Sequence, residues 1–201
     1  MDKENRILSS IVRKYYDLQI DASSLYLISS MLFHIMFISL NKEMRRMEMS
    51  KNEVELFLDK QNIAYQSYEF SSDNIDTSKT PIFKTLVLKG NKTGPTIALV
   101  PLDARLDYKK TAAVSKNRKI GLPPMDYVME TTGYPHGANT PIGIYMHHPE
   151  YPILFDEVIK NYERITVSAG ELDKSVVIAV QDLLDLVHPV IADLLSSKDS
   201  E

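Results

Sequence analysis

The chain has 201 residues, of which 44% are hydrophobic and 25% are charged, a balance typical of a globular protein. It contains no cysteine, which excludes disulfides, thiolate zinc sites and a cysteine nucleophile. The formal net charge of −4 argues against a protein that coats nucleic acid through bulk positive charge, but it leaves room for a local basic contact.

The first 48 residues differ in composition from the rest and are expected to form an N-terminal helical extension, with the main domain at 49–195. Within the extension, residues 25–40 are almost continuously apolar, although His34 and several serines interrupt the run. A membrane span needs roughly 20 apolar residues, and a signal peptide would begin nearer the first methionine. We expect a helix that is buried or packs on a partner, with membrane association as the alternative.

The main domain alternates between short helical and strand-like patterns. Ser50 and Glu53 have capping-box spacing and predict the start of its first helix. Helical patterns occupy 50–60, 107–115, 124–131 and 182–195, the last with Pro189 expected to kink or divide it. Strand patterns occupy 63–70, 82–89, 96–101, 119–122, 153–155, 164–168 and 176–180. The order predicts an α+β fold with a mixed, barrel-like β-sheet core and surrounding helices.

Two segments stand out for their chemistry. Residues 132–143 contain three glycines and two prolines, a composition that predicts a loop and argues against a helix or a central strand. Glycine has no side chain to block a ligand, so the amides of this loop can approach one closely. Upstream, Lys84 is a single cation within the apolar strand pattern at 81–88.

Together, these segments resemble the bacterial aminoacyl-tRNA editing family, which includes the YbaK/EbsC-type deacylases and the editing domain of prolyl-tRNA synthetase. In that family a lysine in a Lys-Thr-Leu strand faces a Gly-x-x-x-Pro loop, which matches Lys84 and residues 137–141 here. Further similar fragments follow in order at 100–110, 119–122, 132–134, 141–143 and 165–170, so the resemblance spans about 50–190. The chain departs from the family at 144–148 and 171–173, where basic residues are usual, and at Phe70, where a tyrosine is often found.

The resemblance implies a trans-editing deacylase, without a cofactor, that clears mischarged Cys or Ala from tRNA, with tRNA(Pro) as the expected substrate. Lys84 is expected to stabilise a phosphate or the developing oxyanion, and the loop amides to serve as oxyanion-hole donors. The candidate catalytic residues are Lys84, Gly137, Ala138, Asn139, Thr140 and Pro141. The candidate substrate-binding residues are Phe83, Gly133, Tyr134, Gly143, Ser168 and Gly170.

The implied partners are the 3′ end of aminoacyl-tRNA, prolyl-tRNA synthetase and a second copy of the chain through the extension. The absence of cysteine is compatible with the reducing cytoplasm, which is the expected location. Residues 109–119 hold five cations and no acid, and form either a solvated surface or a phosphate-facing patch.

Two other functions compete with the deacylase. A metal hydrolase is suggested by His136, His147, His148, Asp156 and Glu157. Their spacing fits no hydrolase motif, so we expect no metal. A non-catalytic module of the same fold, binding tRNA or another partner, is the main alternative, and the missing basic residues favour it.

Overall fold

The computed structural model describes residues 29–30, 32–39, 51–69 and 79–197. The chain divides into two units, Met1–Ser50 and Lys51–Glu201. In the first unit, residues 29–30 and 32–39 are helical, within the helix expected at 25–40. Several large apolar side chains of this segment are exposed, namely Leu32, Phe33, Ile35, Met36, Phe37 and Ile38.

Among the described residues, no helix has both the length and the apolar character that a membrane crossing requires. The rest of the predicted N-terminal helix, the expected boundary after residue 48 and Ser50 lie outside the described residues, as does Phe70. The packing of the apolar segment therefore stays a prediction.

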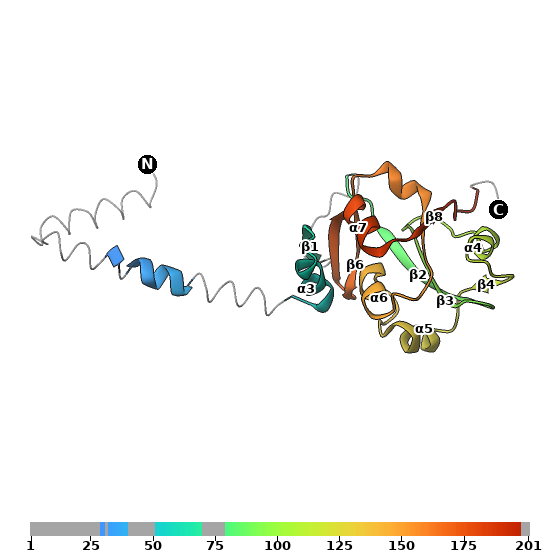
Figure 1. Cartoon of the computed structure of the whole chain (residues 1–201), viewed down its shortest axis with the longest axis horizontal. Coiled ribbons are helices and arrows are strands. Elements are labelled where there is room, and N and C mark those ends of the chain that lie inside the picture. The colour runs from blue at the N-terminus through green and yellow to red at the C-terminus, as the bar shows by residue number, and fades with distance from the viewer. Residues whose placement is uncertain (1–28, 31, 40–50, 70–78, 198–201) are drawn as a thin grey trace, which may run out of the picture. The chain divides into compact units, whose positions relative to one another are not determined.

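Two β-sheets form the framework of the second unit (Figure 1). The smaller sheet is antiparallel and has the order β1 (Tyr65–Glu69), β7 (Lys174–Ala179), β6 (Arg164–Glu171). The larger sheet has the order β4 (Ile120–Gly121), β2 (Phe83–Gly90), β3 (Gly94–Pro101), β5 (Ile153–Asp156), β8 (Val190–Ala192). Its β3–β5 and β5–β8 pairs are parallel and its other pairs antiparallel, so the predicted mixed sheet is confirmed.

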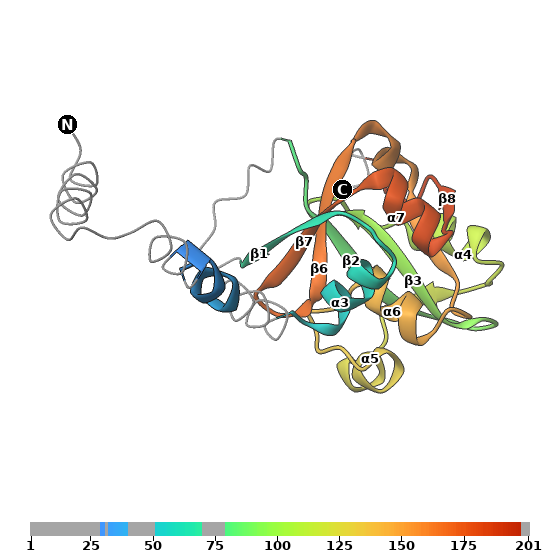
Figure 2. The same ribbon diagram turned by 60° about the vertical axis from the view of Figure 1, so that its left-hand side comes forward.

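The two sheets meet beside the start of β2. Figure 2 shows β6 and β7 next to β2 and β3, with the strands of the two sheets crossing. A parallel bridge joins Ile82 to Thr166, and the Thr166 amide donates to the Pro81 carbonyl at 2.9 Å. The described strands thus form two joined sheets rather than a closed barrel.

Helices cover these sheets and close their ends. They are α3 (Glu53–Lys60), α4 (Tyr108–Val114), α5 (Met125–Thr132), α6 (Pro141–His147), α7 (Val180–Val187) and the 3-10 helix η1 (Glu157–Asn161). The cap of α3 lies two residues beyond the predicted Ser50. Asn52 accepts from the Glu55 amide at 3.0 Å, and the Asn52 amide donates to the Glu55 carboxylate at 2.9 Å. The motif is thus a capping box built on Asn52 rather than Ser50.

Two helix predictions near prolines are wrong in part. Residues 132–143 were expected to lack helix, but Pro141 begins α6, where proline is tolerated because the first amide of a helix needs no partner. The last predicted helix, 182–195, ends at Val187, where His188 adopts a left-handed conformation with φ of 50°. Residues 190–192 instead form β8 against β5.

Strand β2 separates two apolar cores. Phe83 and Val87 belong to the core between the two sheets, whereas Leu88 belongs to a second core under α4. This division follows from the two-residue period of a strand, which sends alternate side chains to opposite faces. Lys84 lies near the end of β2 that meets the smaller sheet, where the candidate site is found.

Candidate active site

A cavity of about 470 Å³ lies between β2, β6, α5 and the glycine-rich loop. Its wall is mainly apolar and comprises Ile82, Phe83, Leu86, Val87, Leu102, Leu122, Pro123, Met125, Val128, Val167 and Leu172, together with the backbone of Gly137. Its polar lining comprises Lys84, Thr85, His136, Asn139, Ser168 and Lys174. The volume is within the usual range for small-molecule pockets, and no carboxylate is among the described residues that line it.

Lys84 reaches the edge of this cavity from β2. Its Nζ donates to the carbonyl oxygens of Leu102 and Ala104, each at 2.8 Å, in the segment that follows β3. Those two bonds orient the ammonium group. Because an ammonium carries three donor hydrogens, one remains for a ligand.

The glycine-rich loop presents only part of its length to the cavity. Gly137 and Asn139 line it, and Gly137 has φ of +93°, a conformation that residues with a side chain rarely adopt. The Gly137 and Asn139 amides have no hydrogen-bond acceptor among the described residues, whereas the Ala138 amide donates to the Pro135 carbonyl at 3.0 Å. The Ala138 amide is therefore already paired within the loop, unlike the other two amides.

The Asn139 side chain fixes the loop to α5. Its Oδ1 lies 3.0 Å from the Thr132 hydroxyl, and its Nδ2 donates to the Pro135 carbonyl at 3.4 Å. On the other side, the Ser168 hydroxyl of β6 donates to the Ala138 carbonyl at 3.1 Å. The loop is thus held on one side by local bonds to the end of α5 and on the other by a long-range bond to β6.

Several predicted site residues do not line the cavity. Ala138 and Thr140 are fully buried and Pro141 is buried, so the Thr140 hydroxyl is not presented to a ligand. The other residues outside the lining are Gly133, Tyr134, Gly143 and Gly170. Of the predicted substrate-binding residues, Phe83 and Ser168 are the ones that the cavity brings together with Lys84.

Tyr134 points into the core and toward α3 instead of toward a ligand. Its hydroxyl donates to the Glu53 carboxylate at 2.5 Å, and the other oxygen of that carboxylate lies 3.0 Å from His147 Nε2. Burial, together with the Glu53 hydrogen bond, raises the pKa of Tyr134. A Cβ on Gly143 would lie 2.6 Å from Tyr134 Cζ, and one on Gly170 would lie 2.9 Å from Tyr134 Cε1. These two glycines therefore make room for the tyrosine ring.

Lys174 is a second cation at the cavity that the sequence prediction missed. It begins β7, and its Nζ lies 2.7 Å from Glu55 of α3, whose side chain is only 4% exposed. Burial raises the pKa of Glu55, but the bonds from Lys174, Ser67 and the Asn52 amide outweigh that effect and lower it overall. The pair joins residues 119 positions apart, so no local pattern announces it.

His136 also lines the cavity, although the sequence prediction considered it only as a metal ligand. The other histidines of that prediction lie elsewhere, with His147 against Glu53 and His148 3.4 Å from Glu150. Asp156 is buried and accepts from the amides of Val158 and Leu194, a structural role. His147, His148 and Asp156 therefore each contact different partners and do not converge on one site.

Comparison with known proteins identifies the fold and the family. The family model of the aminoacyl-tRNA editing domain matches residues 65–186, more than half of the chain. The chain belongs to this family. Enterococcus faecalis EbsC, named as a candidate Cys-tRNA(Pro)/Cys-tRNA(Cys) deacylase, is 31% identical over 159 residues, which cover 74% of this chain and 95% of EbsC.

Two solved structures extend the comparison to the editing-domain fold. The hypothetical protein APE2540 has a TM-score of 0.63 and 18% identity, covering 72% of this chain and 100% of that one. A candidate trans-editing enzyme for prolyl-tRNA synthetase has a TM-score of 0.58 and 23% identity, covering 70% of this chain and 92% of that one. The predicted family is therefore confirmed, and with it the function class of aminoacyl-tRNA deacylation.

Proposed function

We propose that this editing-domain protein is a trans-editing deacylase that releases Cys or Ala from mischarged tRNA, with tRNA(Pro) as its principal substrate. One observation carries the proposal. Lys84 and the glycine-rich loop, which are 53 residues apart at Gly137, line one cavity whose wall is otherwise largely apolar. An aminoacyl ester is already activated, so such a site needs to orient it and stabilise the charge that develops on its carbonyl oxygen.

The proposed chemistry is attack on the ester carbonyl. The carbon–oxygen bond to the ribose then breaks, and the departing ribose oxygen takes a proton. The remaining Lys84 hydrogen and the amides of Gly137 and Asn139 are the donors for the intermediate oxyanion or an adjacent phosphate. The nucleophile is water, which yields the free amino acid, or the thiol of a cysteinyl substrate, which yields a cyclic thioester.

Selectivity is proposed to come from steric exclusion by the apolar wall, including Phe83 and Val128. A tight apolar pocket rejects large side chains but separates small ones poorly, because one methylene contributes only about 1–3 kcal/mol. We therefore expect Cys, Ala and Ser to be released faster than Pro, with modest differences among the small residues. The cytoplasm, where translation supplies mischarged tRNA, is the proposed location, and prolyl-tRNA synthetase is the proposed protein partner.

The decisive experiment compares initial deacylation rates on tRNA(Pro) charged with Cys, Ala or Pro, using the full-length protein and identifying the released product. We expect Cys and Ala to be released faster than Pro. If the substrate thiol attacks, Cys is fastest and leaves as the thioester. Equal rates on all three substrates would contradict selection by size.

A non-catalytic binding module is the second candidate. Glu171 and Asp173 flank Leu172 at the cavity, where the family usually has basic residues, and they reduce the attraction for RNA on that side. Tight tRNA binding by the wild-type protein without turnover of any of the three esters would favour this candidate over the enzyme.

A further inference from the structure

A second hollow adjoins the candidate active site. It is a shallow groove of about 380 Å³ formed by the end of β2, β4 and the segment before α5. Leu122 and Pro123 line both the groove and the cavity, so the two hollows lie next to each other at these residues. On the far side of Leu122 the groove carries Lys89 and Lys119.

The backbone around the groove is fixed by long-range contacts. Lys89 pairs with Gly121 and Gly90 pairs with Ile120 between β2 and β4. The Asn91 side chain accepts from the amides of Arg118 and Lys119 at 2.9 and 3.0 Å. The two groove lysines therefore extend from strands and turns that are tied to each other.

A buried asparagine, Asn117, also holds the turn between β2 and β3 in place. Asn117 accepts from the amides of Lys92 and Thr93, and its Nδ2 donates to Ser115. A Cβ on Gly90 would lie 2.5 Å from the Asn117 side chain, so a larger residue there would displace this asparagine. The groove is thus a built feature of the fold and not a chance gap between surface side chains.

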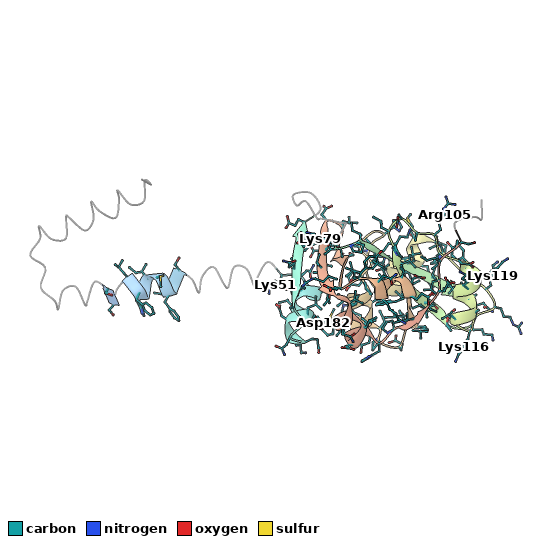
Figure 3. All side chains as sticks on the ribbon, turned by 90° about the horizontal axis from the view of Figure 1, so that it is seen from above. Lys51, Lys79, Arg105, Lys116, Lys119 and Asp182 are labelled. Carbon is teal, nitrogen blue, oxygen red and sulfur yellow. The ribbon has the colours of Figure 1, made fainter. Side chains whose placement is uncertain are left out.

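The charge of the groove is available to a ligand. Lys89 and Lys119 are exposed, and neither forms an ion pair with another described residue. Lys89 Nζ lies 4.4 Å from the centre of the Tyr127 ring, a cation–π contact that orients the ammonium without neutralising it. Figure 3 shows Lys119 projecting from the end of the domain that lies away from β1.

Another lysine of the same basic run is used differently. Lys110 lies 2.7 Å from Asp193, and its Nζ also donates to the Leu195 carbonyl at 2.7 Å. That lysine fastens the C-terminal segment to α4. Lys110 therefore has neither of the two roles predicted for residues 109–119, a solvated surface or a phosphate-facing patch.

We propose that Lys89 and Lys119 bind the backbone phosphates of the unpaired 3′ strand of tRNA, next to the terminal nucleotide whose aminoacyl ester enters the cavity. This inference rests on the proposed deacylase function. The strand would cross Leu122, which is 62% exposed and offers an apolar surface to a base. A protein with a net charge of −4 would then bind RNA through two local contacts rather than through its overall field.

The test compares Lys89→Ala/Lys119→Ala with the charge-matched control Lys109→Ala/Lys116→Ala, whose lysines are exposed and do not line the groove. On full-length aminoacyl-tRNA, we expect the groove variant to raise KM about tenfold or more with kcat unchanged, and the control to change KM less than threefold. The slope of log affinity against log salt should fall by about 1.4, because each single-strand phosphate contact contributes about 0.7.

A phosphate-free substrate, the aminoacyl ester of adenosine, isolates the groove from the cavity. Both variants should deacylate it at the wild-type rate. A KM change on tRNA no larger than that of the control, or an equal loss on the adenosine ester, would overturn the groove proposal while leaving the deacylase in place.

Direct binding of uncharged tRNA separates the two proposals. If the wild type turns over neither substrate, the deacylase proposal fails, and the groove is then judged by tRNA affinity alone. Equal affinities of the wild type and the groove variant would reject the groove. An affinity loss specific to the groove variant, with unchanged Tm, would support it.

Discussion

The two faces of the glycine-rich loop have different roles, one in lining the cavity and the other in packing. One face, with His136, Gly137 and Asn139, lines the cavity opposite Lys84. The other face, with Tyr134 and Gly143, packs against α3 and the core. A single motif therefore combines a ligand-facing turn with the packing that holds this turn in place, and changes on the two faces should have separable effects.

Lys84→Ala tests the cavity face and should have the largest effect. Removing the cation should lower the deacylation rate at least tenfold and up to about 10³-fold, because one charge-stabilising donor contributes about 2–4 kcal/mol in such sites. Stability should fall by less than about 1.5 kcal/mol, since Lys84 makes its two hydrogen bonds to carbonyls near the surface. Single-turnover rates and thermal unfolding measure both quantities, with Lys160→Ala as an exposed control. Wild-type rates in the Lys84 variant would remove this lysine from the mechanism.

Glu55→Gln tests the pair that links the two faces through Lys174. The substitution removes a carboxylate that is only 4% exposed and lies 2.7 Å from Lys174 Nζ, and the loss of such a buried ion pair should cost about 3 kcal/mol of unfolding free energy at pH 7. Asp59→Asn, which removes the exposed pair with Lys51, should cost less than about 1 kcal/mol. Denaturant unfolding of both variants measures the two losses of unfolding free energy. Equal losses would show that the Glu55 pair contributes no more stability than the exposed pair.

The same variant has a pH signature. The pKa of Glu55 is lowered in the folded protein from its ordinary value of 4.5, so its stabilising effect is complete above that value. The effect is lost as the pH falls through the lower folded-state pKa. The wild type should therefore lose more stability than Glu55→Gln between neutral and acidic pH, and parallel pH–stability curves would contradict this.

Gly143→Ala tests the core face. The new Cβ would meet the Tyr134 hydroxyl and lie 2.7 Å from Thr140 Cγ2. Overpacking of this kind costs about 1–3 kcal/mol, and it should also disturb the loop and reduce activity. Gly121→Ala is the matched control, because a Cβ there has no neighbour within 4 Å. Denaturant midpoints of the two variants give the comparison.

Tyr134→Phe should have the smallest effect. It removes the hydrogen bond to Glu53, whose side chain is 50% exposed, so the expected loss is about 1 kcal/mol. The ring stays in place between Gly143 and Gly170, and the deacylation rate should remain within twofold of the wild type. A large loss of activity with little loss of stability would place Tyr134 at the substrate instead.

Much of the fold follows from local sequence patterns. Short apolar runs mark β2 and β3, alternating apolar residues mark β6, and Asp107 caps α4 within one residue of the predicted start. These features are readable because strand and helix periodicities repeat over a few residues. Lys84 and the glycine-rich loop were found in the same way, together with the family resemblance, because a cation and a glycine cluster are unusual in their surroundings.

Other features depend on partners that are distant in the chain. The strand at 190–192 forms only because β5 offers an edge to it, and a proline-divided helix was the better local interpretation. The orientation of the loop residues depends on hydrogen bonds with Ser168, Thr132 and Glu53, which come from three different elements.

The sequence alone thus determined the family, the fold class and the two segments of the candidate site. The tertiary structure decided which residues of those segments line the cavity and that Lys174 lines it too. It also decided that Lys110 forms an ion pair, whereas Lys89 and Lys119 form none with the residues that the structure describes. The physical reason is that backbone propensity and burial period act over a few residues. Cavity walls and ion pairs are instead set by side chains brought together from opposite ends of the domain.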